Sequence, residues 1–142
     1  MRIAWRPLVI PILTLALVGC EGEKLALVFG ADESAVSVES LLVEVDGSEY
    51  TLERSESIVR REVEVEEGSV DIRLALIDTA GDVLVETELE KRIRDDRSHW
   101  VWVIVSTEET SVCEPPDLRL PVPGLADTMF VFSGSLPDDA VC

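Results

Sequence analysis

Hydrophobic and polar residues alternate with a period of two along most of the chain. In one such run, Val70, Ile72 and Leu74 alternate with the charged residues Asp71 and Arg73. Because successive side chains of a β-strand point to opposite faces, this pattern predicts strands with one buried and one solvated face. No segment shows a sustained helical period. Strands are expected at 25–29, 36–45, 49–53, 58–66, 69–77, 82–90, 99–106 and 128–133.

Short glycine-containing breaks separate the alternating runs. Asp46-Gly47 is typical of a two-residue hairpin turn, and Glu67-Gly68 and Ala80-Gly81 are similar breaks. The parity of the hydrophobic positions changes across 37–40, which a β-bulge would explain. The number and spacing of the runs predict an all-β protein. We expect an antiparallel β-sandwich of immunoglobulin-like or transthyretin-like type with about 7–8 strands.

The segment 99–105 differs from the others because both of its faces are apolar, which is typical of a strand covered on both sides. Trp100 and Trp102 share one of these faces. If that face is exposed, the two indoles would form a stacking platform for a sugar ring or a peptide. If it is covered, they belong to the core, where tryptophans usually lie. We expect the proline-containing run 114–123 to be extended, irregular or an edge strand. The disulfide-closed segment 113–142 is expected to lie over the outer face of the tryptophan strand.

The first 19 residues have the pattern of an export signal. Arg2 and Arg6 precede an uncharged run at 7–19, shorter than the roughly 20 apolar residues of a transmembrane helix. The run ends in Leu17-Val18-Gly19-Cys20, which resembles the lipobox of bacterial lipoproteins, in which small residues precede an obligatory cysteine. The resemblance implies cleavage before Cys20, a diacylglyceryl group on its sulfur and usually an acyl chain such as palmitate on its new amine. An ordinary secretory signal followed by a chance cysteine is the alternative.

The resemblance also implies an organisation and a location. Residues 1–19 would be the signal peptide, 20–24 the lipidated cysteine and a short tether, and 25–142 a single domain. In the enterobacterial form of the family, aspartate after the cysteine retains the protein in the inner membrane. Glu21 departs from that signal, so the outer membrane is favoured.

The charge of the chain limits its partners. The whole chain carries −17, and loss of Arg2 and Arg6 would leave 29 acidic and 10 basic residues, or −19. Nucleic acid is therefore not an expected partner, because phosphate binding needs clustered basic residues. Such a domain is also not expected to adhere to anionic headgroups, so the lipid on Cys20 must hold it at the membrane.

Cys113 and Cys142 remain once Cys20 is assigned to the lipid. Exported domains retain disulfides, so one bridge is predicted, and it would stabilise the fold by about 3.6 kcal/mol at most. Two thiols and the distant His99 lack the paired spacing of a zinc site. We expect no metal and no cofactor.

Candidate catalytic groups are few. Ser98 and His99 are neighbours on an expected strand, so they point to opposite faces, and no glycine elbow presents a serine. We interpret His99 as a surface histidine at the start of its strand. Asp78 and Asp82 place two carboxylates on a turn, fewer than the roughly six to eight oxygens that calcium takes.

The densest acidic run is interpreted as a solvated face whose charges keep a sheet edge from aggregating. A docking surface for a basic partner, or a calcium site, is the alternative. Cross-strand arginines are expected to offset the repulsion within the run. The run is Glu62, Glu64, Glu66 and Glu67, and the expected partners are Arg73, or Arg54 with Arg60 and Arg61.

These features favour a lipid-anchored, non-enzymatic binding or assembly module of the bacterial cell envelope, with an envelope protein or a glycan as partner. The alternative is a carbohydrate- or peptide-binding domain that uses Trp100 and Trp102. A hydrolase that uses Ser98, His99 or carboxylates is a weaker third hypothesis. The sequence has no phosphate-binding loop, zinc motif or dinucleotide fingerprint.

Overall fold

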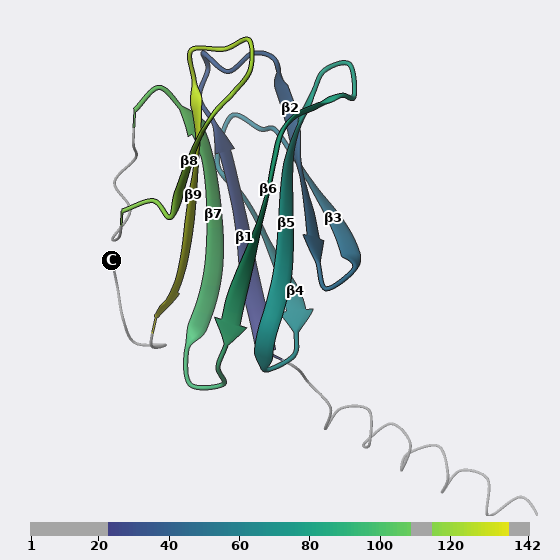
Figure 1. The fold of residues 1–142 in the computed structure, drawn as a ribbon, viewed down its shortest axis with the longest axis vertical. Helices are drawn as coiled ribbons and strands as arrows, with labels where there is room; N and C mark the ends of the chain where they lie inside the picture. Colours follow the sequence, from purple (N-terminus) through teal and green to yellow (C-terminus); the bar gives the residue numbers. More distant parts are fainter. Residues whose placement is uncertain (1–22, 109–114, 137–142) are drawn as a thin grey trace, which may run out of the picture.

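The computed structural model describes residues 23–108 and 115–136, which form a β-sandwich of two sheets (Figure 1). The all-β fold expected from the alternating pattern is confirmed. Within the described ranges there are nine strands, and no helix is long and apolar enough to cross a membrane. The strands are β1 (Glu23–Ala31), β2 (Val38–Val45), β3 (Ser48–Glu53), β4 (Val59–Val65), β5 (Gly68–Asp78), β6 (Val83–Ile93), β7 (Ser98–Ser106), β8 (Leu118–Pro121) and β9 (Thr128–Leu136).

The two sheets have the strand orders β4-β1-β7-β9-β8 and β3-β2-β5-β6. Paired strands are antiparallel, as expected, with one exception, because β1 and β7 are parallel. A parallel pair needs a crossover, and here the chain passes through the other sheet between β1 and β7. Alternation within single strands carries no information about this long-range pairing.

The core lies between the two sheets and is built from the inward positions of both. Burying each large apolar side chain contributes roughly 1.5–3 kcal/mol, which is the main force that holds the sheets together. The largest fully buried side chains of this core are Phe29, Leu25, Leu27, Leu41, Leu52, Ile72, Leu74, Leu76, Ile93, Met129 and Val38.

The local signals in the sequence act as expected at the turns. Asp46 and Gly47 both have positive φ, 46° and 87°, and join β2 to β3 as a tight hairpin. The expected bulge is present as a register shift between Val38 and Ser40 in the pairing of β2 with β5. It explains why the hydrophobic parity changes there.

The expectation that segment 113–142 covers the tryptophan strand is wrong for its described residues, 115–136. β9 pairs with β7 and β8 pairs with β9, so both strands extend the sheet instead of lying over it. The reason is that β9 has apolar side chains on both faces and so fits an inner position of the sheet. β8 is an edge strand, one of the alternatives foreseen for it. Cys20, Cys113 and Cys142 lie outside the described residues, so lipidation and the disulfide stay predictions.

The outer face of the five-stranded sheet carries a second apolar cluster. Trp100 is only 9% exposed and lies across the backbone of Gly134, its partner on β9. A Cβ atom added at Gly134 would lie 2.4 Å from Cζ2 of Trp100, so only glycine permits this close approach. The cluster consists of Ala26, Trp100, Ile104, Phe130 and Phe132, with Trp102 packed against it.

We predict that Gly134→Ala destabilises the protein by about 1–3 kcal/mol, because the added methyl group must displace the indole. Denaturant unfolding measures the change. In a Trp100→Ala background the same substitution should be neutral or slightly stabilising, since alanine loses less backbone entropy than glycine in a strand. Equal effects in the two backgrounds would show that the indole does not require this glycine.

Candidate functional site

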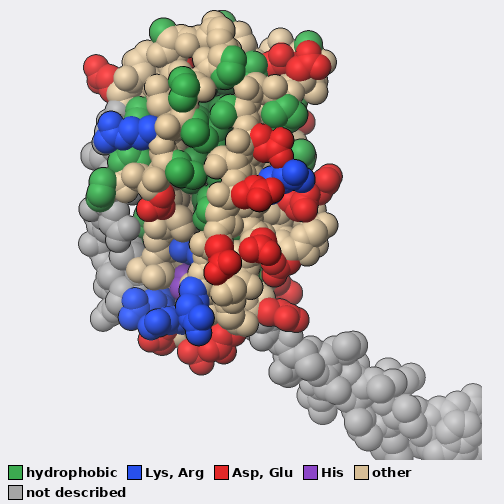
Figure 2. All heavy atoms as spheres, in the orientation of Figure 1, with side chains coloured by type: hydrophobic (Ala, Val, Ile, Leu, Met, Phe, Trp, Pro, Cys, Tyr) green, Lys and Arg blue, Asp and Glu red, His purple; other side chains and the backbone are tan. Residues whose placement is uncertain are grey.

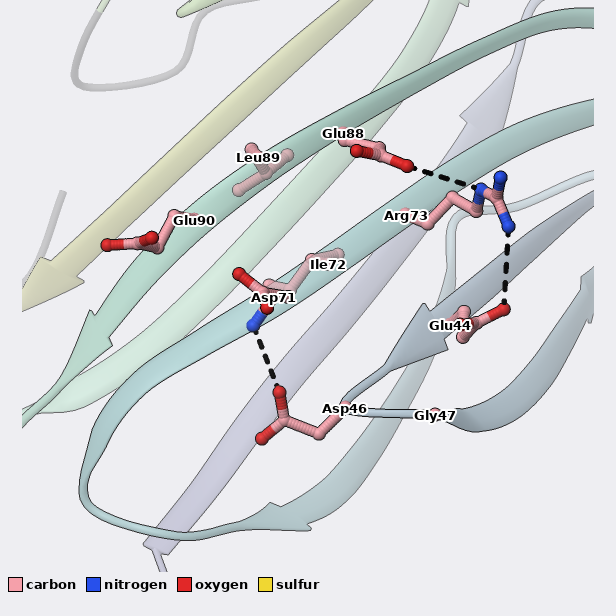
Figure 3. Close-up of a pocket in the computed structure, with 9 residues that line it drawn as sticks. All are labelled: Glu44, Asp46, Gly47, Asp71, Ile72, Arg73, Glu88, Leu89 and Glu90. Atoms are coloured by element: carbon pink, nitrogen blue, oxygen red, sulfur yellow. Dashed lines mark hydrogen bonds and ion pairs between the residues drawn. The ribbon is translucent and has the colours of Figure 1, made fainter.

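Acidic side chains gather over the four-stranded sheet, on the right-hand side of the molecule in Figure 2. There the outer face of β2, β5 and β6 holds a depression of about 710 Å³ (Figure 3). We call it the acidic depression. Its lining residues are Glu44, Asp46, Gly47, Asp71, Ile72, Arg73, Glu88, Leu89 and Glu90.

Arg73 is the single basic residue in this lining and lies on the central strand β5. Its Nε lies 2.5 Å from Oε1 of Glu86 and 3.6 Å from Oε1 of Glu88, both on β6. Its Nη1 lies 3.9 Å from Oε2 of Glu44 on β2. One guanidinium is therefore shared by three carboxylates on two neighbouring strands. About half of the Arg73 side chain is exposed, so each pair is solvent-screened and adds little stability.

The other carboxylates of the depression form no ion pair with a described basic side chain. Asp46 uses one oxygen, Oδ1, to accept the backbone N–H of Asp71 at 3.0 Å, which holds the β2–β3 turn against β5. Asp71 lies directly opposite Glu90 across the β5–β6 ladder. Like charges in opposite positions repel, and no described basic side chain forms an ion pair with either. The surface is therefore complementary to a cationic partner.

The described residues contain no group of three or more potential ligands placed to hold a metal ion. The carboxylates of the depression are spread over three strands instead of converging on one point. This arrangement suits an extended cationic surface better than a single ion.

The carboxylate of Asp78, which the sequence places at a turn, has a structural role. Its Oδ1 accepts the backbone N–H groups of Ala80 at 2.9 Å and Asp82 at 2.8 Å. The carboxylate thus closes the β5–β6 turn. The Asp78 carboxylate therefore needs no cation to explain its position.

The predicted acidic run lies largely on β4, which is an edge strand of the five-stranded sheet. This position fits the interpretation of a charged, solvated edge. Arg60 pairs with Glu62 at 3.0 Å on the exposed surface. The expectation that Arg73 offsets the acidic run is wrong, because Arg73 lies in the other sheet and pairs with carboxylates there.

Arg54 has a structural role that its sequence context does not indicate. Its guanidinium donates to the carbonyl oxygen of Asp32 at 2.6 Å and to the carbonyl oxygens of Ala35 and Val38. It thereby ties the β3–β4 connection to the β1–β2 loop. Arg61 lies over the ring of the β3 tyrosine, 5.1 Å from its centroid. The expectation that Arg54 and Arg61 offset the acidic run is therefore wrong.

His99 is not a surface residue, which corrects the sequence interpretation. It shares the inward parity of Val101 on β7 and is 2% exposed. Its Nε2 lies 2.8 Å from the backbone nitrogen of Arg94 and 3.0 Å from the same residue's carbonyl oxygen. Its Nδ1 is buried and has no hydrogen-bond partner among the residues that the structure describes. Ser98 is exposed and has the opposite parity, so the described geometry does not assemble a serine–histidine pair.

The tryptophans do not present two flat, open faces. Their ring centroids lie 6.1 Å apart at an interplanar angle of 72°, an edge-to-face arrangement. Trp100 is nearly buried over Gly134, and only Trp102 is partly exposed. This arrangement favours a packing role for the pair over a stacking platform.

We predict that His99→Ala loosens the β6–β7 turn, because the backbone groups of Arg94 lose their buried partner. Amide hydrogen exchange at Arg94 should accelerate, and stability should fall by about 1–3 kcal/mol. His99→Gln, whose amide both donates and accepts, should restore part of the protection. Unchanged exchange at Arg94 in His99→Ala would contradict this role.

Comparison of the chain with models of protein families, with curated proteins and with solved structures found no match. No relative therefore supplies a ligand or a reaction by analogy. The function has to be argued from the chemistry of the described residues and from the lipobox-like motif.

Proposed function

We propose that this protein is a lipid-anchored, non-enzymatic binding or assembly module of the bacterial cell envelope, and that it binds a cationic surface of an envelope protein. The acidic depression on the four-stranded sheet carries the proposal. Five carboxylates and one arginine line it.

The geometry of the depression supports binding of an extended partner. Four of its five carboxylates project from three hydrogen-bonded strands, so the backbone that carries them loses little freedom when a partner binds. Their shared sign would steer a basic partner to this face and accelerate association. An open sheet face also favours binding over catalysis, since catalytic groups generally act in sites from which water is excluded.

The anchor is supported by the sequence around Cys20. The run that precedes it resembles a lipoprotein signal, and β1 begins at Glu23, three residues further on. Two or three acyl chains on Cys20 would anchor the domain stably, whereas a single chain holds a protein only reversibly. The folded domain would then sit directly at the bilayer surface.

We predict that Cys20→Ala moves the protein from the membrane to the soluble envelope fraction, because the residue that receives the lipid is lost. Membrane fractionation with detection of the chain measures the change. Cys113→Ala is the matched control, since it also removes a thiol but leaves the lipidation site. Retention of the Cys20→Ala variant in the membrane would refute the anchor.

We predict that Glu44→Gln, Glu88→Gln and Glu90→Gln together reduce capture of the partner about tenfold or more, because three charges of the depression are removed. The full chain is cross-linked in its own envelope, and the recovered proteins are quantified. Raised salt should have the same effect.

The matched control replaces Glu33, Glu56 and Glu108 with Gln. These exposed residues lie at the opposite end of the sandwich, and the change in net charge is identical. Equal loss of capture in both triple variants would show that net charge matters and the depression does not. Unchanged capture in the depression variant would overturn the proposed binding face.

A further inference from the structure

Basic side chains are concentrated in one short segment of this acidic domain. Of the 10 basic residues that follow Cys20, four lie within 91–97: Lys91, Arg92, Arg94 and Arg97. This segment forms the end of β6, the β6–β7 turn and the approach to β7. Figure 2 shows basic side chains gathered around the histidine at the lower end of the molecule, with acidic side chains next to them. The same segment also carries two exposed carboxylates, Asp95 and Asp96.

This end of the sandwich is also the end at which the chain enters the domain. Glu23, the first residue of β1, lies opposite Val65 at the end of β4, and Gly68 at the start of β5 lies opposite Ile93. Because β1 and β7 are parallel, Leu25 lies beside His99. We call this end, with the turns at 66–67 and 94–97, the tether end (Figure 1).

Three of the four basic side chains are presented to solvent. Lys91 is 7% exposed and donates through Nζ to the carbonyl oxygen of Gly134 at 2.6 Å, so it is used inside the fold. Arg92 and Arg94 are exposed. The side chain of Arg97 is 37% exposed, with its Nε 3.5 Å from Oδ1 of Asp96.

The β6–β7 turn is held in place by a buried side chain, that of His99. Nε2 of His99 contacts both backbone polar groups of Arg94, and the histidine is buried. A hollow of about 290 Å³ lies beside this turn. Its lining mixes both signs of charge and comprises Glu23, Lys24, Ala26, Arg60, Glu62, Asp95, Arg97, Ser98 and His99.

The tether brings this end close to any bilayer in which Cys20 is anchored. Glu23 follows Cys20 by three residues, and a chain spans at most roughly 3.3–3.6 Å per residue, or about 10 Å in total. That distance is close to the Debye length of about 8 Å at physiological ionic strength. The arginines therefore lie within the electrostatic range of lipid phosphates, whose oxygens a guanidinium fork binds well.

We propose that the tether end docks on the phosphate groups of membrane lipids through Arg92, Arg94 and Arg97, so that the strands stand upright on the bilayer. The proposal rests on the lipid anchor proposed above. It revises the expectation that charge does not help the domain at the membrane. Anionic lipid repels the acidic domain as a whole but attracts the arginines at the tether end. The two forces together orient the domain with this end toward the bilayer.

The test uses the mature, lipidated chain in supported bilayers of phosphatidylcholine with or without phosphatidylglycerol, and neutron reflectometry measures the thickness of the protein layer. Upright strands of nine residues give a layer of about 30 Å. A sandwich lying on its side gives roughly 20–25 Å, the depth of two packed sheets with their side chains.

We expect the wild-type layer to be thick on phosphatidylglycerol and thinner on phosphatidylcholine alone or at high salt. The triple variant R92Q/R94Q/R97Q should give the thin layer on both, while R92K/R94K/R97K should keep the thick one. The control R61Q/R119Q removes two arginines that lie away from the tether end and outside the acidic depression, so its layer should be as thick as that of the wild type. Circular dichroism checks that all variants fold.

The outcomes separate the two proposals. Absence of the wild-type chain from the bilayer overturns the anchor, and docking through the tether end falls with it. A retained wild-type chain whose layer thickness does not depend on lipid charge overturns the docking alone. An R92Q/R94Q/R97Q layer as thick as wild type on phosphatidylglycerol also overturns it.

Discussion

The parallel pairing of β1 with β7 is the constraint on which the rest of the arrangement depends. It places two strands with apolar residues on both faces side by side in one sheet. Their inward faces require the four-stranded sheet as a cover, and their outward faces are packed with aromatic side chains of β7 and β9. The same pairing sets Leu25 beside His99, so the start of the domain and the β6–β7 turn share one end of the sandwich.

The positions of the charged residues say more about possible partners of this protein than its net charge does. Several carboxylates lie together on the outer face of the four-stranded sheet, where one guanidinium is shared among three of them. The exposed arginines of 92–97 lie at the tether end instead. The net charge by itself shows neither of these arrangements.

Several polar residues that look functional in the sequence serve the fold. Asp78 closes a turn through backbone N–H groups, and Arg54 binds carbonyl oxygens of a loop. His99 holds the backbone of Arg94. In each case the partner is a main-chain group of a turn or loop, since these segments lack a complete ladder and their polar groups must be satisfied in other ways. The acidic depression is different because Asp71 and Glu90 lie opposite each other there, and neither forms an ion pair with a described basic side chain.

Local chemistry was readable from the sequence alone. Alternation in runs such as Val70 to Leu76 determined the strands and their buried faces, Asp46-Gly47 determined a hairpin, and the parity change before Leu41 marked a bulge. Each of these depends on residues close together in the chain, whose steric preferences act without the rest of the fold. Only the tertiary structure decided that β1 and β7 are parallel, that His99 faces the core, and that Glu44, Arg73 and Glu88 meet on one face. Those outcomes depend on which strands pair and in what register, and that is settled by burial of apolar surface over the whole domain.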